Sequence, residues 1–424
     1  MKLLERSYIF IISIIIYRLL LDYIYMEVIG EVFNYMGFLI DENDFSYYSS
    51  WILLFILILF MVKIVKMNLF SSNVMMLLFL ISFVPMTSLM RFNPMDFNFF
   101  ILYSTYWLAL ILYYLFVSRF KVNPNNFKTK ISMQLWFLII FFLISILFLS
   151  GYYHNFRFTI NLSDVYAFRT EQRESNYPSI FGYIIPAASN ILPLFLVYFL
   201  IKKKYIWVII LSVVMIFNFS LGGHKSVLAN LFLVFLGYLF FNYKSIYKYS
   251  WALISLILIS IIELKTFSTI FITNFIVRRV LFIPAKLNYY YYDFFSKNSP
   301  DFYLQGPLRR LGLESEYKTS IPRIIGEQYY NSYEMSANNG LFSDAYANLN
   351  ILGVLILPLI IVFIFKLGDS VSIGLPGKLM FLPIIAFTTS FISGFFTSVL
   401  LTNGILLLLI CLYYYPRDLY SKLS

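Results

Sequence analysis

Long apolar runs alternate with short polar segments along most of this 424-residue chain. The runs are continuously apolar, which is typical of helices in lipid, whereas the strands of a membrane barrel alternate between apolar and polar positions. The pattern predicts twelve helices, near residues 7–26, 50–66, 73–90, 98–117, 132–151, 179–201, 205–221, 226–242, 250–268, 349–366, 377–397 and 401–415. Twelve membrane spans of about 20 residues need about 240 residues, so the chain is long enough for them and their loops.

The composition supports this interpretation. Hydrophobic residues make up 60% of the chain and charged residues 12%, whereas soluble domains have roughly 45–50% and 25%. A soluble globular protein and a disordered protein are therefore excluded. The single cysteine, Cys411, excludes a disulfide framework and a cysteine-based metal site.

The charges predict an orientation. If the N-terminus is cytoplasmic, the cytoplasmic segments contain 17 basic and three acidic residues, and the rest of the chain contains 15 basic and 18 acidic residues. Basic residues collect in the short cytoplasmic loops of membrane proteins. We therefore expect both termini in the cytoplasm, and we attribute the net charge of +11 to topology rather than to a nucleic-acid partner.

Two segments on the outer side are longer than a simple connection needs, residues 151–178 and 266–348. Long loops of this kind usually have a function. The expected fold is one integral membrane domain over residues 1–424, an all-α polytopic protein of about twelve transmembrane helices with a large outer loop before the last three spans.

The first outer loop contains Arg169 and Arg173, four residues apart. On a helix capped by Ser163, with Asp164 in its first turn, both guanidinium groups share one face, where they suit a phosphate or pyrophosphate. The alternative is a solvated surface helix in which Glu171 and Glu174 pair with the two arginines.

The second loop places six aromatic residues around Asp293, namely Tyr289, Tyr290, Tyr291, Tyr292, Phe294 and Phe295. Tyrosines at a membrane surface often form an interfacial belt. A carbohydrate platform is the other interpretation, with rings covering the apolar faces of sugars while hydroxyls and carboxylates bind their edges.

The LGGHKS segment at residues 221–226 predicts a short turn that places His224 and Lys225 at the outer membrane boundary. Lys225 is suited to binding a phosphate as a point charge, although a histidine at such a place is more often a capping residue. His154 has no partner that the sequence identifies. Neither histidine has a second ligand at metal-binding spacing, so we expect no metal site.

Four segments resemble the bacterial O-antigen (repeat-unit) polymerases of the Wzy type: VYAFRTEQR at 165–173, LGGHKS at 221–226, RRVLFIPAKLNYYYYDFF at 278–295 and IGEQYYNSYEMSANNGLFSDAYANLNILG at 325–353. The layout of many spans and one large late loop is also similar. The chain departs from the family in two respects. Asn350 stands where a glycine is usual, and the Arg-x10-Gly and His-x10-Gly patterns of some members are absent.

The resemblance implies an enzyme of the bacterial inner membrane that joins undecaprenyl-diphosphate-linked oligosaccharides on the periplasmic side. The growing chain passes from its lipid carrier to the non-reducing end of a new unit, with inversion and without a metal or cofactor. Such polymerases work alongside a chain-length regulator. Arg and Lys side chains would stabilise the departing pyrophosphate, and a carboxylate would assist the acceptor hydroxyl.

The resemblance and the location of the residues predict the following site residues. For the pyrophosphate they are Arg169, Arg173, Lys225 and Arg279, followed by Arg278 and Arg323. For the general base they are Glu334, then Glu327, then His224. For the sugar they are Tyr166, Tyr292 and Asn338, while Gly340 and Pro284 are expected to shape the backbone.

Two other functions stay open. An O-antigen ligase shares the layout but attaches finished glycan to the lipid A core. A flippase for the same lipid-linked units would keep its charges between the helices and would have short loops. The charges within the spans are few (Arg18 and Asp22, four residues apart and able to pair), and the large loop lies outside. The sequence therefore favours the polymerase.

Overall fold

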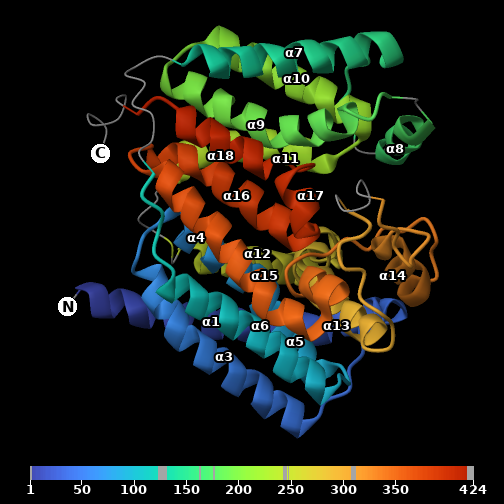
Figure 1. The fold of residues 1–424 in the computed structure, drawn as a ribbon. Coiled ribbons are helices and arrows are strands. Elements are labelled where there is room, and N and C mark those ends of the chain that lie inside the picture. The colour runs from blue at the N-terminus through green and yellow to red at the C-terminus, as the bar shows by residue number, and fades with distance from the viewer. Residues whose placement is uncertain are drawn as a thin grey trace. The chain divides into compact units, whose positions relative to one another are not determined.

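The computed structural model describes residues 2–122, 131–161, 164–174, 177–241, 246, 248–306 and 312–417 (Figure 1). Within these residues every regular element is a helix. The elements are α1 (Lys2–Ile24), η1 (Tyr25–Ile29), α2 (Gly30–Val32), η2 (Asn34–Met36), α3 (Asp44–Val65), α4 (Phe70–Leu78), η3 (Phe79–Phe83), α5 (Val84–Phe92), α6 (Phe97–Phe116), α7 (Met133–His154), α8 (Val165–Glu174), α9 (Phe181–Ile201), α10 (Tyr205–Gly222), α11 (Lys225–Phe240), α12 (Lys248–Phe267), η4 (Thr273–Phe282), α13 (Ile283–Phe295), α14 (Ile321–Tyr330), α15 (Phe342–Ser372), α16 (Gly377–Ser393), α17 (Phe396–Leu400) and α18 (Ile405–Tyr414).

Ten helical segments in the described residues are long and apolar enough to cross a membrane. Two shorter apolar helices, Lys225–Phe240 and Gly377–Ser393, fall at two further predicted spans. Each of the twelve predicted apolar runs overlaps a helix, although the last run, 401–415, is helical only over Ile405–Tyr414. The protein is thus an α-helical, polytopic membrane protein, while the count of twelve spans and the sidedness of the loops stay predictions.

The helices form two compact units. Unit 1 comprises Met1–Ser118, Ser245–Phe365 and Phe391–Phe396, and unit 2 comprises Arg119–Lys244, Lys366–Ser390 and Thr397–Ser424. The helix α15 belongs to unit 1 up to Phe365 and to unit 2 from Lys366.

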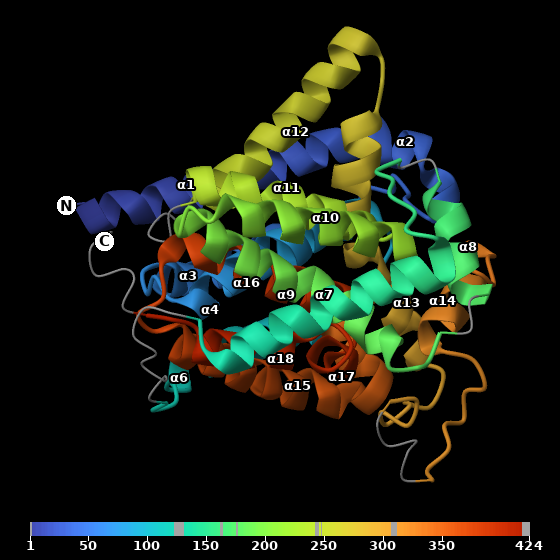
Figure 2. The same ribbon diagram turned by 90° about the horizontal axis from the view of Figure 1, so that it is seen from above.

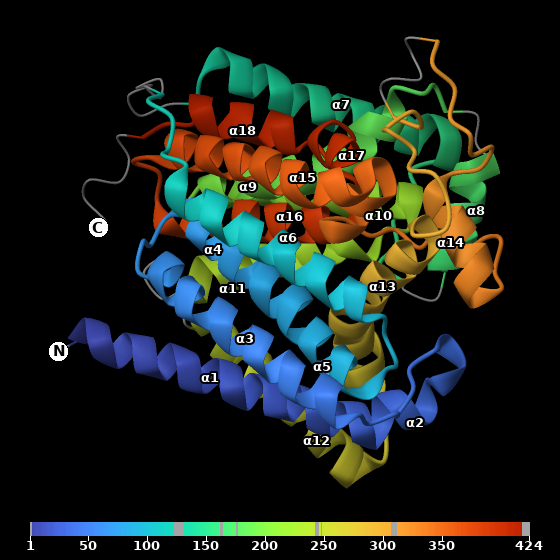
Figure 3. The same ribbon diagram turned by 60° about the horizontal axis from the view of Figure 1, so that its bottom comes forward.

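In unit 1, α1 packs along α12, and α3 packs against α5 and α6 (Figures 2 and 3). Aromatic side chains fill much of the interior between these helices. The ring of Phe83 lies parallel to that of Tyr103 at 6.0 Å between centroids and edge-on to Trp107 at 5.5 Å. All three side chains are buried, so the high aromatic content serves the core as well as the membrane surface.

After α12 the chain turns and returns as a second long helix, which Figure 2 shows beside the end of α12. This returning helix consists of η4, which is π-helical, and α13, and runs from Thr273 to Phe295. It packs against α5 and η3, where η3 is itself π-helical. The sequence placed these residues in a loop, because Arg278, Lys286 and Asn288 interrupt the apolar pattern.

In unit 2, α10 packs against α7, α9 and α11, while α18 packs against α9 (Figure 1). The buried Arg417 follows α18 and donates hydrogen bonds to the carbonyls of Ile373, Val371, Leu412, Tyr413 and Tyr415, at 2.7–3.1 Å. Because the last carbonyls of a helix have no partner within it, this one side chain caps the ends of both α15 and α18.

The helix α15 is interrupted at Asn350, where φ is 50° and ψ is −134°. A positive φ of this kind is costly for any residue except glycine. The segment Phe342–Leu349 and the segment from Ile351 onwards are therefore two helices joined at a kink.

Candidate functional site

The returning helix Thr273–Phe295 carries the candidate site of unit 1. Its beginning is fixed by the carboxylate of Glu263, which accepts hydrogen bonds from the backbone amides of Phe271 and Ile272 at 2.7 and 2.8 Å. Val277 and Leu281 are fully buried. The helix is thus anchored at one end by a cap and along one side by apolar packing, which also buries some of its polar residues.

Arg278 is one of these residues, with only 6% of its surface exposed. Its guanidinium donates to Oδ1 of Asn274 at 2.5 and 2.9 Å, and to the thioether sulfur of Met36 at 3.1 Å. The guanidinium carbon lies 4.5 Å from the centroid of the Phe33 ring. Burial, and then the neighbouring Arg279, lowers the pKa of Arg278. A thioether is a weak acceptor, so this cation has binding capacity left.

Lys286 lies two helical turns further along and is 4% exposed. Its ammonium donates to the carbonyl oxygen of Gly37 and to Oδ1 of Asn93, both at 2.6 Å. The nitrogen is 5.4 Å from the centroid of the Tyr290 ring. Burial lowers the pKa of Lys286 to about 7, because its partners are dipoles and a ring rather than an opposite charge.

Within the described part of the chain, neither Arg278 nor Lys286 forms an ion pair with a carboxylate. Buried charges in proteins are normally paired. Both cations instead contact the short segment Phe33–Gly37, which includes η2. The same helix therefore presents two buried positive charges that have neutral partners.

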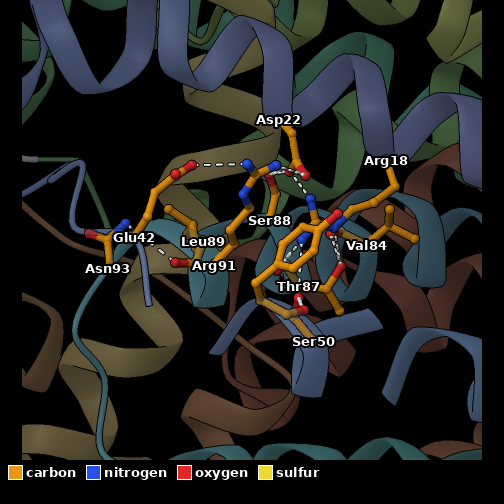
Figure 4. Close-up of polar contacts among 11 residues, drawn as sticks. Arg18, Asp22, Glu42, Ser50, Val84, Thr87, Ser88, Leu89, Arg91 and Asn93 are labelled. Atoms are coloured by element: carbon orange, nitrogen blue, oxygen red, sulfur yellow. Dashed lines mark hydrogen bonds and ion pairs between the residues drawn. The ribbon is translucent and has the colours of Figure 1, made fainter. Parts of the chain in front are cut away.

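A second group of charges, shown in Figure 4, lies between α1, α3 and α5. Asp22 is at its centre and forms an ion pair with Arg18 and another with Arg91, at 3.0 Å. It also accepts a hydrogen bond from Ser88 at 2.5 Å. Arg91 reaches outwards to the half-exposed Glu42 at 2.9 Å. The four charges alternate in sign and cancel.

Arg18 is fully buried. It donates to Oγ1 and to the carbonyl oxygen of Thr87 at 3.0 and 2.7 Å, and to Oγ of Ser50 at 3.2 Å. The predicted pairing of Arg18 with Asp22 is confirmed. Arg91 adds a third charge to the pair that the sequence indicated, because it contacts Asp22 and lies in the span Phe70–Phe92.

Asn93 connects this charged group to the returning helix. It follows α5, two residues after Arg91. Its amide nitrogen donates to the Tyr25 hydroxyl at 2.7 Å, and its oxygen accepts from Lys286. The Tyr25 hydroxyl donates in turn to the carbonyl of Leu39 at 2.8 Å. The ends of α1 and α5 are therefore tied to α13 through polar contacts.

The four consecutive tyrosines of α13 have different surroundings. Tyr291 is buried and donates to the carbonyl of Ala337 at 3.0 Å. Tyr290 donates to the carbonyl of Met36 at 3.2 Å, and Tyr292 donates to Oδ2 of Asp96 at 2.8 Å. Tyr289 is partly exposed. The run therefore includes both core residues and surface residues, and only part of it can form a belt or a platform.

The segment from Ala337 to Asn348 supports α13 from the other side. The amide of Asn339 donates to the carbonyl of Pro284 at 3.0 Å and to Oγ of Ser343 at 2.8 Å. The hydroxyl of Ser343 donates to Oδ1 of Asn288 at 3.1 Å. At Gly340 an added Cβ would lie 2.2 Å from the carbonyl oxygen of Phe391. Gly340 thus shapes the backbone, as predicted, while the role of Pro284 stays a prediction.

Asp344 lies in the same segment, Ala337–Asn348, and binds backbone outside it. It is buried and accepts hydrogen bonds from the backbone amide of Phe396 at 2.6 Å and from the side chain of Asn348 at 2.9 Å. Asn348 also accepts from the backbone amide of Tyr303 at 3.0 Å. The polar residues of this segment are therefore used to fix loops.

In unit 2, the predicted helix of the first outer loop is present as α8 and contains Tyr166, Arg169 and Arg173. The side chains of these three residues lie outside the described part of the structure. The predicted capping residue Ser163 also lies outside it. The predicted turn is also present, since α10 ends at Gly222 and α11 begins at Lys225. Gly223 is left-handed at φ 58°, and its added Cβ would lie 2.7 Å from the carbonyl of Val165.

The first turn of α8 thus packs on the turn that contains His224 and Lys225. Arg157 strengthens this contact, as it donates to Glu171 at 2.6 Å and to the carbonyl of Ser220 at 2.7 Å. The sequence identified no partner for His154, but the structure shows two. His154 ends α7 and contacts the hydroxyl of Tyr177 and the carboxylate of Glu171.

The remaining predicted residues belong to unit 1 and lie at its surface. Arg279 is exposed, with its guanidinium carbon 5.3 Å from the Phe275 ring. Arg323 and Glu327 are exposed on α14, and Glu334 and Asn338 are exposed after it. The roles assigned to these residues stay predictions. The sequence missed Lys286, Arg91 and Arg157, because their importance depends on burial and on distant partners.

No family model matches the chain, and searches of the curated proteins and of the solved structures give no significant match. The protein is therefore described by its own structure, as an α-helical, multi-pass membrane protein with a buried cationic site on the helix Thr273–Phe295.

Proposed function

We propose that this protein polymerises undecaprenyl-diphosphate-linked oligosaccharide repeat units into O-antigen polysaccharide on the periplasmic face of the bacterial inner membrane. The growing glycan leaves its lipid diphosphate as the bond from its anomeric carbon to the phosphate oxygen breaks. A hydroxyl of the next unit forms the new glycosidic bond and loses its proton. The transfer is inverting and independent of metal, as in the polymerases that the sequence resembles.

The observation that carries this proposal is the pair of buried cations, Arg278 and Lys286, on one helix with neutral partners. The departing lipid diphosphate gains negative charge, and preorganised cations stabilise such charge most effectively where water is excluded. A guanidinium binds phosphate oxygens bidentately, while an ammonium binds them as a point charge. A diphosphate would replace the weak thioether acceptor of Met36 at Arg278 and would add an anionic partner at Lys286.

Asn350 gives independent support. The resemblance places a glycine at this position, and the backbone here has a φ of 50°, which favours glycine. The backbone conformation at this position therefore gives a physical reason why glycine is usual there in the polymerases, although this chain has asparagine.

The test uses purified protein in proteoliposomes, supplied with undecaprenyl-diphosphate-linked repeat units. We expect glycan chains longer than one unit together with released undecaprenyl diphosphate. Arg278→Gln and Lys286→Gln should each slow chain growth by about 10²–10³-fold, the usual effect of removing one preorganised donor. Lys318→Gln, an exposed change in the same predicted loop, is the control.

Because a buried substitution can unfold the protein, each variant is also compared by its thermal unfolding midpoint, and Arg278→Lys tests whether charge alone restores part of the rate. Folded wild-type protein that forms no longer chains from these units contradicts the proposal. Transfer of finished glycan to the lipid A core would instead identify a ligase.

A flippase is the second candidate, favoured by one observation. The group of Arg18, Asp22 and Arg91 lies between helices within the membrane spans, where a transporter of charged lipids keeps its charges. Proteoliposomes with a fluorescent lipid-linked unit separate the two functions, since a flippase moves the lipid between leaflets without forming a glycosidic bond.

A further inference from the structure

Three residues form a stripe along one face of α13. Lys286, Tyr290 and Asp293 are spaced i, i+4 and i+7, which places them on the same side of a helix. Exposure increases along the stripe, from 4% for Lys286 and 8% for Tyr290 to 32% for the Asp293 side chain. The stripe therefore runs from a buried cation to an accessible carboxylate.

The carboxylate of Asp293 is held in place from two sides. Oδ1 accepts a hydrogen bond from Lys297, and Oδ2 accepts one from the hydroxyl of Tyr329, both at 2.6 Å. A carboxylate has about four acceptor positions, so two positions remain for a ligand. Partial burial raises the pKa of Asp293, but these two hydrogen bonds lower it more, and its pKa is below the usual value. The group is thus an ionised, positioned acceptor.

Aromatic rings flank this carboxylate. Tyr329 stacks on Tyr290, with 4.3 Å between ring centroids and 14° between planes. The partly exposed Tyr289, one helical turn before Asp293, lies edge-on to Phe99 at 5.2 Å. The Tyr289 ring also stacks with that of Tyr292 at 6.3 Å between centroids, and Tyr292 donates to Asp96. Burial, and then the charge of Asp293, raise the pKa of Tyr289.

Asp96 supplies a second carboxylate at this surface. It is exposed and caps α6 by accepting from the amide of Asn98 at 2.9 Å, while its other oxygen accepts from Tyr292 at 2.8 Å. Acidic acceptors next to aromatic rings suit a ligand with many hydroxyl donors and apolar C–H faces. They disfavour an anion, because like charges repel.

We propose that Asp293, with Asp96 and the rings of Tyr289 and Tyr329, forms a binding surface for a neutral carbohydrate. The carboxylate of Asp293 accepts hydrogen bonds from sugar hydroxyls, and the rings contact the apolar face of the sugar. The aromatic residues around Asp293 are the carbohydrate platform that the sequence left open. The structure adds Tyr329, which donates to Asp293, and Asp96, which accepts from Tyr292.

This inference rests on the proposed function in one respect, the identity of the sugar as part of a lipid-linked repeat unit. Lys286 and Asp293 are seven residues apart, or about 10 Å along the helix axis. A diphosphate at Lys286 and the sugars attached to it would therefore follow the stripe in order, with the charged group at the buried end and the hydroxyls at the exposed end.

Saturation-transfer NMR on the purified full-length protein tests the surface directly. The probes are neutral monosaccharide methyl glycosides (glucose, galactose, rhamnose, N-acetylglucosamine) and, separately, inorganic pyrophosphate in competition with a fluorescent phosphate analogue. Asp293→Asn should weaken binding of at least one glycoside by about tenfold or more, as lost charge-assisted hydrogen bonds do, and should change pyrophosphate affinity by less than about twofold. Lys286→Gln should weaken pyrophosphate binding by about tenfold or more and should change glycoside affinity by less than about twofold.

Two further variants separate binding from folding. Glu314→Gln removes an exposed carboxylate of the same predicted loop and should leave glycoside binding unchanged. Tyr329→Phe keeps the ring and removes the hydroxyl that holds Asp293, so it should weaken binding less than Asp293→Asn. If Asp293 only fastens α14 to α13, Asp293→Asn lowers the unfolding midpoint and leaves glycoside affinity intact.

The outcomes also distinguish this inference from the proposed function. Glycoside binding that depends on Asp293, in a protein that does not extend lipid-linked units, supports the surface and contradicts the polymerase. Chain growth in which Asp293→Asn changes neither glycoside affinity nor the KM for the acceptor unit overturns the surface and leaves the polymerase standing. Absence of binding to every glycoside in the wild-type protein also overturns it.

Discussion

The ammonium of Lys286 donates a 2.6 Å hydrogen bond to the carbonyl oxygen of Gly37, 249 residues away in the sequence. Gly37 has a φ of 82°, and a Cβ on it would lie 2.2 Å from the hydroxyl of Tyr290. The turn at Gly37 and the returning helix are therefore fitted to each other, and a buried amine lies at their contact.

We expect the cost of burying Lys286 to depend on pH. Its pKa is about 7 in the folded protein and 10.5 when unperturbed, so the unfolded state binds more protons between these values and stability rises with pH there. Each pKa unit corresponds to about 1.4 kcal/mol, so the cost below pH 7 is at most about 5 kcal/mol. Lys286→Met should therefore raise the unfolding midpoint more at pH 6 than at pH 9.

The measurement is thermal unfolding in detergent at both values of pH, with the exposed Lys318→Met as control. A gain from Lys286→Met that is the same at pH 6 and pH 9 contradicts the buried-charge interpretation. Binding of pyrophosphate should weaken between pH 6 and pH 8 in the wild-type protein, because the neutral amine does not attract an anion.

The two ion pairs of Arg91 should differ in energy. Asp22 and Glu42 both contact this guanidinium, at 3.0 and 2.9 Å, but Asp22 is buried and Glu42 is half-exposed. Asp22→Asn leaves Arg18 and Arg91 without their shared partner and should cost about 3–5 kcal/mol. Glu42→Gln removes a solvated pair and should cost about 0–1 kcal/mol. Chemical denaturation measures the unfolding free energy of both variants. An equal loss from Asp22→Asn and Glu42→Gln would contradict the predicted difference between the two ion pairs.

Gly340 should tolerate no side chain. A Cβ there would lie 2.2 and 2.5 Å from the carbonyl oxygens of Phe391 and Gly394, and backbone atoms cannot move aside as a flexible side chain can. We expect Gly340→Ala to cost about 1–3 kcal/mol. Gly182→Ala is the matched control, because a Cβ on Gly182 meets nothing within 4 Å, and in helix α9 it should gain about 0.5–1 kcal/mol.

Asn350→Gly should stabilise the protein, because the φ of 50° and ψ of −134° at this residue favour glycine. Asn350→Ala should destabilise it by about 1–3 kcal/mol, the usual cost of a strained backbone region. Unfolding midpoints in the order Gly, Asn, Ala are expected. If Asn350→Ala and Asn350→Gly have the same unfolding midpoint, the backbone at the kink does not favour glycine.

The predicted arginines can be compared in cells. Under the proposed function, Arg169→Ala and Arg279→Ala should leave single repeat units on the lipid A core and no long chains, as seen in a gel of the lipopolysaccharide. Arg278, which is buried beside the exposed Arg279, should give the same result when it is replaced by alanine. Normal ladders in all three variants remove the pyrophosphate role, whereas loss of single repeats points to the flippase or the ligase.

The helices were predictable because burial in lipid requires long apolar runs, and these can be read directly from the sequence. The turn at Gly223 and the helix α8 were also predicted, from glycines and from capping residues. The returning helix was not, because its burial depends on packing against α5 and on the Glu263 cap, and no local pattern shows this. Lys286 was missed for the same reason, since only its distant partners, Gly37 and Asn93, distinguish it from a surface lysine.

The kink at Asn350 has a consequence for the membrane. The helix after it, residues 351–372, has about 22 residues and is about 33 Å long, which matches a hydrocarbon core of about 30 Å. The segment before it is therefore not needed to cross the bilayer, so Asp344 and Asn348 can keep their polar contacts in the interfacial zone. The break therefore separates a helix long enough to cross a bilayer from the polar segment before it.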